Sequence, residues 1–495
     1  MSMLFKRILA ALLASAALVS FTSCGFIVVN DVSSRRTGRG AETAGEDGGG
    51  DAVPEATRFV KYRSREDAKA LSESYVAALP ERDYEGAVFF VTTPNRSFLS
   101  PEDTETVLSR LALQRNEEIA ERFNVTLLTS EEDPATMLDE MRQAAEAGTF
   151  YTDLLLIPFY RVGEYKIADL LLNMRTAPFF SLDEPYFNAE SSQMTSGGYA
   201  TYAVAGSASI SPDNLAALYM NKAVLKDAGE DPFALFRAVE DGTWTWDVLG
   251  AEIEAVCTNT DAGTFSASSS LIERVPDLVF KAMGNNFVLT MDRREPLVGF
   301  SVNSAKKTME LLASLYQDDR GGLGNAEGAA ELFTEGGCAF YVEYLTAMES
   351  LTYVPADWSV LPLPKGSEEA EGYKTLVSND TGTFAIPKDH TNPEIPAIIL
   401  SGLNAASYGY MNDAYVEYYM MNVMRDNDSV NMLDLILDTA SFDFAIAFGN
   451  AYPEIAEATY KRVRAAAPTN TLGEGFTEKR GEANRTMREN FDLSY

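Results

Sequence analysis

The sequence has little of the residues on which metal sites and histidine-dependent catalysis rely. Its 495 residues include one histidine, His390, and three cysteines, with no Cys-x-x-Cys pair. Zinc sites with histidine ligands, Ser-His-Asp triads and a disulfide framework are therefore nearly excluded. His390 lies in a polar run that ends in a proline, so we expect its side chain to be exposed. We expect no metal and no cofactor.

Basic residues are also few, since 40 Lys and Arg face 73 Asp and Glu and the formal charge is −33. This balance argues against nucleic acid and against an anionic membrane surface as partners. Solubility is the simplest explanation of the charge. A positively charged ligand is a second interpretation, although the acidic residues are scattered along the chain.

The N-terminal run of apolar residues, 8–19, is too short to predict a membrane span. It follows Lys6 and Arg7 and precedes Thr22-Ser23-Cys24, a pattern that resembles a bacterial lipobox. We therefore expect a signal peptide over residues 1–23 and a lipid on Cys24. A plain signal peptide with a coincidental cysteine is the alternative. Residues 24–57, rich in glycine and charge, read as a flexible tether.

Two further cysteines, Cys257 and Cys338, have no local partner. We expect two buried free thiols. A disulfide between them is the alternative in an extracellular protein.

The first third of the chain alternates predicted strands and helices. Apolar runs at 87–92, 124–128 and 153–158 read as strands, and residues 66–78 and 134–147 as helices, the second closed by Gly148. Ser100 and Pro101 predict the start of the helix that precedes the second strand. This alternation is typical of a parallel sheet covered on both faces.

In such sheets, ligands bind beyond the carboxyl ends of the strands. The loops after the first and third predicted strands are thereby nominated as binding loops. They carry Thr93 and Asn95, and Tyr160 and Arg161.

The middle of the chain holds an ordered set of motifs between residues 214 and 256. An apolar run reaches Asn221-Lys222, a helix ends near Gly229, and a second helix follows Pro232. Then comes Gly242-Thr-Trp-Thr-Trp-Asp, in which Thr245 can cap a third helix.

This order resembles the sugar-type extracellular solute-binding proteins of bacterial ABC importers, family 1. Later segments extend the resemblance: Phe333-x-x-Gly-x-x-x-Phe340, the Val-x-Pro-x-Pro-Lys passage that ends at Lys365, and a clostridial-type run over residues 425–433. Each motif is weak alone, but their shared order covers about residues 88–448.

The resemblance implies an α/β fold of the periplasmic-binding-protein type II, with two lobes, a hinge and a ligand cleft between them. Lobe 1 would comprise residues 58–205 and 361–410, and lobe 2 residues 206–360 and 411–495.

The function implied is capture of a carbohydrate, an oligosaccharide, and its delivery to the permease subunits of an ABC importer. The protein would be a monomer without enzymatic activity, anchored to the outer face of the cell membrane through Cys24. Further ligand-binding candidates from the crossing region and from the strand after the glycine passage are Ser207, Ser209, Asp213, Glu343 and Tyr344.

Other interpretations remain. A peptide or polyamine could replace the sugar, and the chain could be a surface lipoprotein without a transport role. A glycoside hydrolase would need a carboxylate pair that the sequence does not single out. Trp244 and Trp246 could stack on a sugar, but we expect at least Trp246 to pack in the core. Trp358 is open to both roles.

Overall fold

A computed structural model of the chain describes residues 65–102, 104–290, 295–321, 323, 328–354, 356–424, 426 and 428–491. The predicted signal peptide, Cys24 and the tether lie outside these residues and stay predictions. Within the described ranges, no helix is both long enough and apolar enough to cross a membrane.

The first sheet has the strand order β13-β3-β1-β2. Strand β1 (Ala87–Thr93) pairs in parallel with β2 (Val125–Glu131) and β3 (Leu154–Pro158), which confirms the predicted parallel arrangement. Strand β13 (Gly382–Ala385) joins from far along the chain, antiparallel to β3. We call this sheet and its helices the first lobe.

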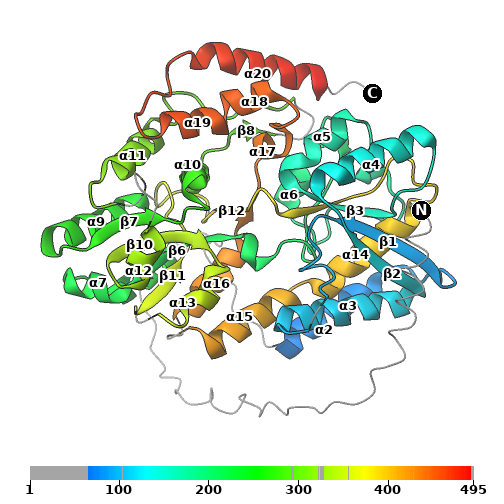
Figure 1. Cartoon of the computed structure of the whole chain (residues 1–495), viewed down its shortest axis with the longest axis horizontal. Helices are drawn as coiled ribbons and strands as arrows, with labels where there is room; N and C mark the ends of the chain where they lie inside the picture. The colour runs from blue at the N-terminus through cyan, green and yellow to red at the C-terminus, as the bar shows by residue number, and fades with distance from the viewer. Residues whose placement is uncertain are drawn as a thin grey trace, which may run out of the picture. The chain divides into compact units, whose positions relative to one another are not determined.

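Helices cover both faces of the first sheet (Figure 1). Leu154 and Leu156 of β3 join a core with α3 (Val107–Phe123) and α14 (Glu394–Ser407), against which α2 (Arg65–Ala78) also packs. Leu155 and Ile157 point the other way and join the core that holds α4 (Pro134–Ala147). Successive side chains of a strand alternate between faces, so this division shows two buried faces, as predicted.

The second sheet has the order β11-β6-β10-β7 and forms the second lobe. Strand β6 (Ala216–Asn221) is antiparallel to β10 (Cys338–Tyr344) and to β11 (Trp358–Leu361), whereas β7 (Gly263–Ala267) is parallel to β10. All six residues of β6 are buried. The apolar run before Asn221-Lys222 is thus a central strand.

The remaining elements are short connections and helices. They are η3 (Phe159–Arg161), α5 (Val162–Ile167), η4 (Met174–Thr176), α6 (Ala189–Met194), β4 (Ser196–Gly197), β5 (Ala200–Thr201), η5 (Pro212–Asn214), α7 (Lys222–Asp227), α8 (Pro232–Glu240), α9 (Trp246–Asn259), η6 (Ile272–Arg274), α10 (Val275–Ala282), β8 (Val288–Leu289), β9 (Leu297–Val298), α11 (Lys306–Gln317), α12 (Ala329–Thr334), α13 (Ala347–Leu351), β12 (Thr375–Leu376), α15 (Tyr410–Asn422), α16 (Asp428–Asp438), β14 (Ala440–Ser441), α17 (Phe444–Phe448), α18 (Pro453–Ala458), α19 (Tyr460–Ala466) and α20 (Phe476–Asn490).

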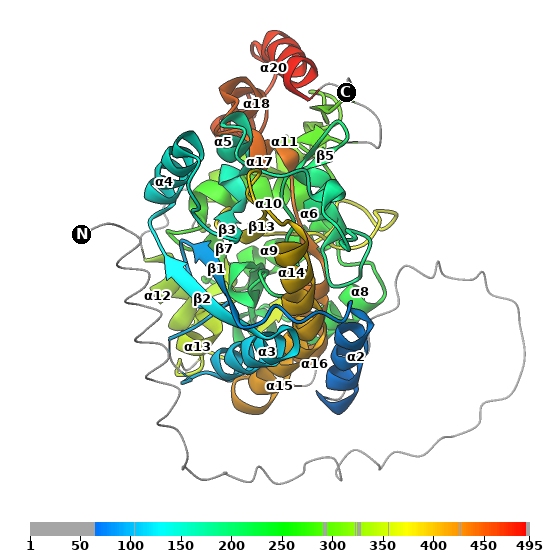
Figure 2. The same ribbon diagram turned by 90° about the vertical axis from the view of Figure 1, so that its right-hand side faces the viewer.

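Two crossing segments, residues 206–215 and 375–381, connect the lobes and lie side by side. Leu215 bridges Val377, and the Ser378 amide donates to the Asn214 carbonyl at 2.8 Å. Gly206 sits so close to Asn404 of α14 that a Cβ would lie 2.3 Å from the Asn404 side-chain oxygen. Helix α15 is a third link, because it contacts α2 and α3 of the first lobe and α16 beside the second sheet (Figure 2).

Most predicted helix ends are confirmed, and one start is wrong. Thr245 caps α9 by accepting from the Val248 amide, and Gly148 closes α4 with a φ of 62°. Helix α3, however, begins after Thr106, whose side chain accepts from the Ser109 amide, and not at Ser100-Pro101. Ser100 instead belongs to a turn in which its amide donates to the Arg96 carbonyl at 2.7 Å and its own carbonyl accepts from the Arg96 side chain.

All three tryptophans are buried in the core. Trp246 is 4% exposed and lies beside Phe265 of β7, as expected. The indole N–H of Trp244 donates to the Pro362 carbonyl at 2.9 Å, and that of Trp358 to the Leu351 carbonyl at 2.8 Å. In this structure none of the three offers a ring to a ligand.

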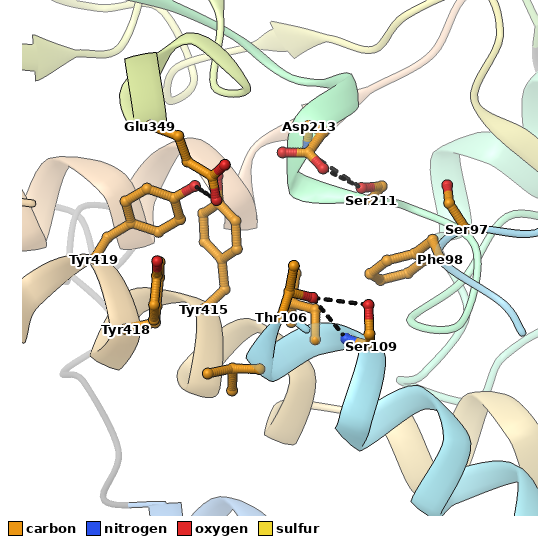
Figure 3. A pocket seen from close by; sticks show the side chains of 12 residues that line it. Ser97, Phe98, Thr106, Ser109, Ser211, Asp213, Glu349, Tyr415, Tyr418 and Tyr419 are labelled. Atoms are coloured by element: carbon orange, nitrogen blue, oxygen red, sulfur yellow. Dashed lines mark hydrogen bonds between the residues drawn. The ribbon is translucent and has the colours of Figure 1, made fainter. Parts of the chain in front are cut away.

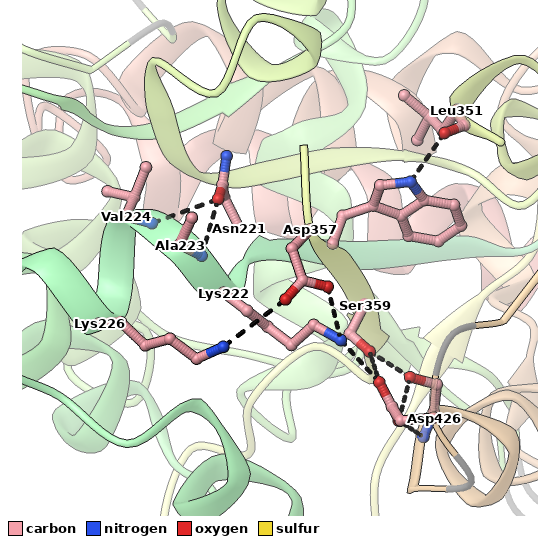
Figure 4. Close-up of polar contacts among 11 residues, drawn as sticks. Asn221, Lys222, Ala223, Val224, Lys226, Leu351, Asp357, Ser359 and Asp426 are labelled. Atoms are coloured by element: carbon pink, nitrogen blue, oxygen red, sulfur yellow. Dashed lines mark hydrogen bonds and ion pairs between the residues drawn. The ribbon is translucent and has the colours of Figure 1, made fainter. Parts of the chain in front are cut away.

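Lys222, the lysine of the Asn-Lys motif, has a structural role (Figure 4). Its side chain is 3% exposed, and its ammonium lies 3.0 Å from Asp357 and 2.7 Å from Asp426. Asn221 caps α7 by accepting from the Ala223 and Val224 amides. The motif therefore ends a strand, starts a helix and ties both to the segment before α16.

Two expectations about single residues are wrong. The His390 side chain is only 7% exposed, because its Nε2 lies 3.0 Å from Asp153 at the start of β3. Cys257 and Cys338 are both free thiols, but only Cys338 is buried and Cys257 is exposed on α9.

Candidate functional site

A cavity of about 600 Å³ lies between the two lobes, at the carboxyl ends of β1 and β3. The first lobe lines it with the loop after β1, the end of β3 and the start of β13. The crossing segment and the start of α13 line it from the other side. The polar members of this lining are Thr93, Asn95, Ser97, Ser209, Ser211, Asp213, Asn214, Thr346 and Asp380. We call this cavity the polar compartment.

A second cavity of about 190 Å³ adjoins the first and shares Ser97, Phe98, Ser211 and Asp213 with it. Three tyrosines of α15, the first turn of α3 and Glu349 of α13 complete its wall (Figure 3). We call it the aromatic compartment. The two compartments form one cleft whose walls come from segments far apart in the sequence.

Tyr415, Tyr418 and Tyr419 lie on one face of α15, because residues three and four positions apart on a helix are neighbours. The ring centroids of Tyr415 and Tyr419 are 4.5 Å apart, and those of Tyr418 and Tyr419 are 5.1 Å apart. Phe98 faces them from the first lobe (Figure 3). The compartment thus offers aromatic surface from two sides.

Two carboxylates, Asp213 and Glu349, border the aromatic compartment. Glu349 accepts from the Tyr419 hydroxyl at 3.3 Å, and Asp213 accepts from Ser211 at 3.5 Å. Burial raises the pKa of Asp213, the charge of Glu349 raises it further, and the hydrogen bond from Ser211 offsets only part of this. The ionised form of Asp213 is therefore poorly stabilised by its surroundings.

Four of the nine predicted ligand-binding residues line the cleft, namely Thr93, Asn95, Ser209 and Asp213. The side chains of Thr93 and Asn95 also shape the loop after β1. The Thr93 hydroxyl donates to the Asn95 carbonyl at 2.9 Å, and the Asn95 side chain accepts from the Ser97 amide at 2.9 Å. These residues set the edge of the cleft.

The other five candidates line neither compartment, and each has a partner elsewhere. Arg161 pairs with Glu164 at 2.6 Å, and the Tyr160 amide donates to the Asn379 carbonyl. The Tyr344 hydroxyl accepts from Arg274 at 2.8 Å. Ser207 donates to the Tyr186 carbonyl, and Glu343 accepts from the Tyr344 amide. Their role in binding stays a prediction.

Sequence reasoning missed Phe98, Glu349 and the tyrosines of α15. A signal was present for the tyrosines, since their spacing of three and one residues places them on one helix face. Glu349 carried no signal, because it is one acidic residue among 73 Asp and Glu.

Metal binding has no candidate in the described part of the chain, where no group of three or more His, Cys, Asp or Glu side chains is placed to hold an ion.

Comparison with solved structures defines the class of fold. The cyclic α-maltosyl-1,6-maltose binding protein from Arthrobacter globiformis is similar over 82% of this chain and 100% of its own, with a TM-score of 0.56 and 13% sequence identity. The fold is the predicted one, an α/β periplasmic-binding-protein type with two lobes.

Two further structures match with a TM-score of 0.49. They are the GacH receptor of Streptomyces glaucescens, 15% identical over 83% of this chain and 100% of its own, and the maltose-binding protein MalE from Listeria monocytogenes, 12% identical over 83% and 99%. No protein-family profile and no curated protein sequence matches the chain.

Proposed function

We propose that the protein is an extracellular, membrane-anchored solute-binding protein that captures a carbohydrate between its two lobes and delivers it to an ABC importer. The observation that carries the proposal is the cleft itself, which is lined from both lobes at the carboxyl ends of β1 and β3. In open α/β sheets this edge is where ligands bind.

The chemistry of the cleft suits a sugar. Sugar C–H faces pack on aromatic rings, and hydroxyls donate to carboxylates and accept from amides and hydroxyls. Tyr418 and Phe98 supply the rings, and Asp213, Asn214 and Thr346 supply polar groups. The neighbour from Arthrobacter is named for binding a cyclic maltose derivative, which adds support from a protein of the same fold.

Binding would act through the hinge. A ligand that touches both lobes binds the closed state more tightly than the open one, so it shifts the population toward closure. The paired crossing segments and α15 are the links that would bend. Attachment through Cys24 would hold this body close to the importer in the membrane.

Thermal unfolding of the purified protein against neutral and charged mono- and oligosaccharides, peptides and polyamines tests the proposal. A ligand present at a hundred times its dissociation constant adds about 2.7 kcal/mol and raises the midpoint by a few degrees. A rise with one class of sugar supports the proposal. A rise with peptides or polyamines alone contradicts the carbohydrate assignment, and no rise with any compound favours a surface lipoprotein without a transport role.

A further inference from the structure

All the charged side chains that line the cleft are acidic. Three carboxylates line its two compartments, those of Asp213, Glu349 and Asp380, and no Lys, Arg or His does. Among the described residues, none of the three acids forms an ion pair, whereas other acids with little exposure do, such as Asp426 with Lys222 and Asp277 with Arg464.

A buried hydroxyl in the same compartment is poorly satisfied. Tyr415 is 3% exposed and lines the aromatic compartment, and its hydroxyl lies near that of Tyr419 but makes no hydrogen bond of good geometry to any described residue. Buried polar groups without a partner are rare in folded proteins, and each suggests a missing contact. Figure 3 shows the Tyr415 ring among Tyr418, Tyr419 and Glu349, with Phe98 on the other side of the compartment.

Carboxylates near one another in a partly buried site repel and lose hydration. A neutral hydroxyl group donates a hydrogen bond to a carboxylate but leaves the charge in place. A protonated amine donates up to three hydrogen bonds and neutralises the charge as well. Its positive charge is also attracted to the faces of tyrosine and phenylalanine rings.

We propose that the aromatic compartment binds a protonated amino group of the ligand, held by Asp213 and Glu349 among the rings of α15 and Phe98, so that the captured carbohydrate is an amino sugar. This inference rests on the proposed function, because it names the class of sugar for the same cleft. The Tyr415 hydroxyl would complete the contact by hydrogen bonding to the bound sugar or to its amino group.

Matched sugars test the inference. We would measure binding of glucosamine, galactosamine, mannosamine and the β-1,4 disaccharide of glucosamine to the purified full chain by titration calorimetry. The comparison compounds are the N-acetylated and the hydroxyl forms of the same sugars. We expect one of the amines to bind at least tenfold more tightly than both of its neutral counterparts, with the difference shrinking as salt is raised.

Variants then locate the contact. Glu349→Gln and Asp213→Asn should each weaken binding of that amine about tenfold and weaken binding of its neutral counterparts by a clearly smaller factor, because a neutral side chain keeps the hydrogen bond to a hydroxyl but loses the attraction to a cation. Glu454→Gln removes an exposed acid from α18 and should change nothing. Tyr415→Phe should keep the thermal midpoint of the free protein and weaken binding severalfold, an effect that a purely structural tyrosine would not show.

The outcomes separate the two proposals. Binding of a neutral sugar as tight as that of its amine overturns the inference and leaves the proposed function standing. If none of the amines binds, the inference is overturned, and the wider thermal panel decides whether the proposed function also fails. Binding of spermidine without any amino sugar overturns both.

Discussion

Two pairs of acidic side chains in this protein differ in the charged and polar groups that surround them. Asp357 and Asp426 share the buried ammonium of Lys222, at 3.0 and 2.7 Å (Figure 4). Asp213 and Glu349 border the aromatic compartment, where Asp213 accepts from Ser211 and Glu349 from Tyr419, and neither pairs with a cation among the described residues (Figure 3).

The pKa directions of Asp426 and Asp213 follow from this difference. Burial alone would raise the pKa of Asp426, but hydrogen bonds from Lys222 and Ser429 outweigh it, and the pKa lies below its usual value. The pKa of Asp213 is raised, because burial and the charge of Glu349 are not compensated. Asp426 is therefore stabilised as a carboxylate by its cation, whereas the carboxylate of Asp213 is kept in the cleft at a cost in stability.

Removing the ammonium that Asp357 and Asp426 share should have the largest effect on stability. Lys222→Met leaves Asp426 without its ammonium partner and Asp357 with only the exposed Lys226, and loss of one member of a buried ion pair costs about 3 kcal/mol or more. We expect the free energy of unfolding, measured in urea, to fall by that amount. Lys226→Met is the matched control, since Lys226 is 52% exposed and pairs with Asp357 at 3.6 Å. Equal effects of the two variants would contradict a structural role specific to Lys222.

Next in size is the effect on ligand affinity of removing a cleft ring. Tyr418→Ala deletes aromatic surface from the aromatic compartment and should weaken binding about tenfold, or about 1.4 kcal/mol. Tyr160→Ala should weaken it less, since Tyr160 lines neither compartment. Calorimetric titration with the ligand that the thermal panel identifies gives both values. A larger loss of affinity for Tyr160→Ala would show that the ligand binds near η3 and not in the aromatic compartment.

Replacing Asp213, the unpaired acid of the cleft, with a neutral residue should stabilise the protein. The pKa of Asp213 is raised in the folded state, so folding is opposed by ionisation at any pH above the pKa of the unfolded chain. Asp213→Asn should therefore raise the free energy of unfolding at pH 7, and the gain should vanish near pH 3. Asp247→Asn, at an 85% exposed side chain, is the control. A loss of stability at pH 7 would refute this reasoning.

The smallest effect concerns an unpaired acid outside the cleft. Burial and the charge of Glu230 raise the pKa of Glu252 on α9 to about 7. Stability is then lost as pH rises from the unfolded value, about 4.3, through 7. After allowance for solvent screening, Glu252→Gln should add about 0.5 kcal/mol at pH 8.5 and nothing at pH 4.

Glu254→Gln on the exposed side of α9 is the comparison for Glu252→Gln. If Glu252→Gln stabilises the protein as much as Asp213→Asn does, an unpaired and destabilising acid does not distinguish the cleft from the rest of the protein.

Local sequence predicted most of the fold. The apolar runs at β1, β2 and β3 and the caps at Thr245 and Gly148 are short-range signals, and the structure confirms each of them. The start of α3 was predicted wrongly because Ser100-Pro101 and Thr106 are both acceptable local starts. The contacts of the loop with Arg96 decide between them.

The cleft was predictable only in part. Thr93 and Asn95 follow a parallel strand, so the general position of ligands in α/β sheets was enough to nominate them. Tyr415 and Glu349 reach the same cleft from segments that are more than 200 residues further along the chain. The burial of His390 was also not predictable from local sequence, because its partner Asp153 is more than 200 residues away in the chain.

Local sequence patterns predict the main strands and helices of the first lobe and their order, because these depend on side-chain periodicity and on hydrogen bonds within a few residues. The pairing of charges, in contrast, follows from the packing of distant segments. Lys222 pairs with both Asp357 and Asp426, and no cation of the described residues pairs with Asp213, because pairing requires atoms within about 4 Å, and only the packed chain sets such distances.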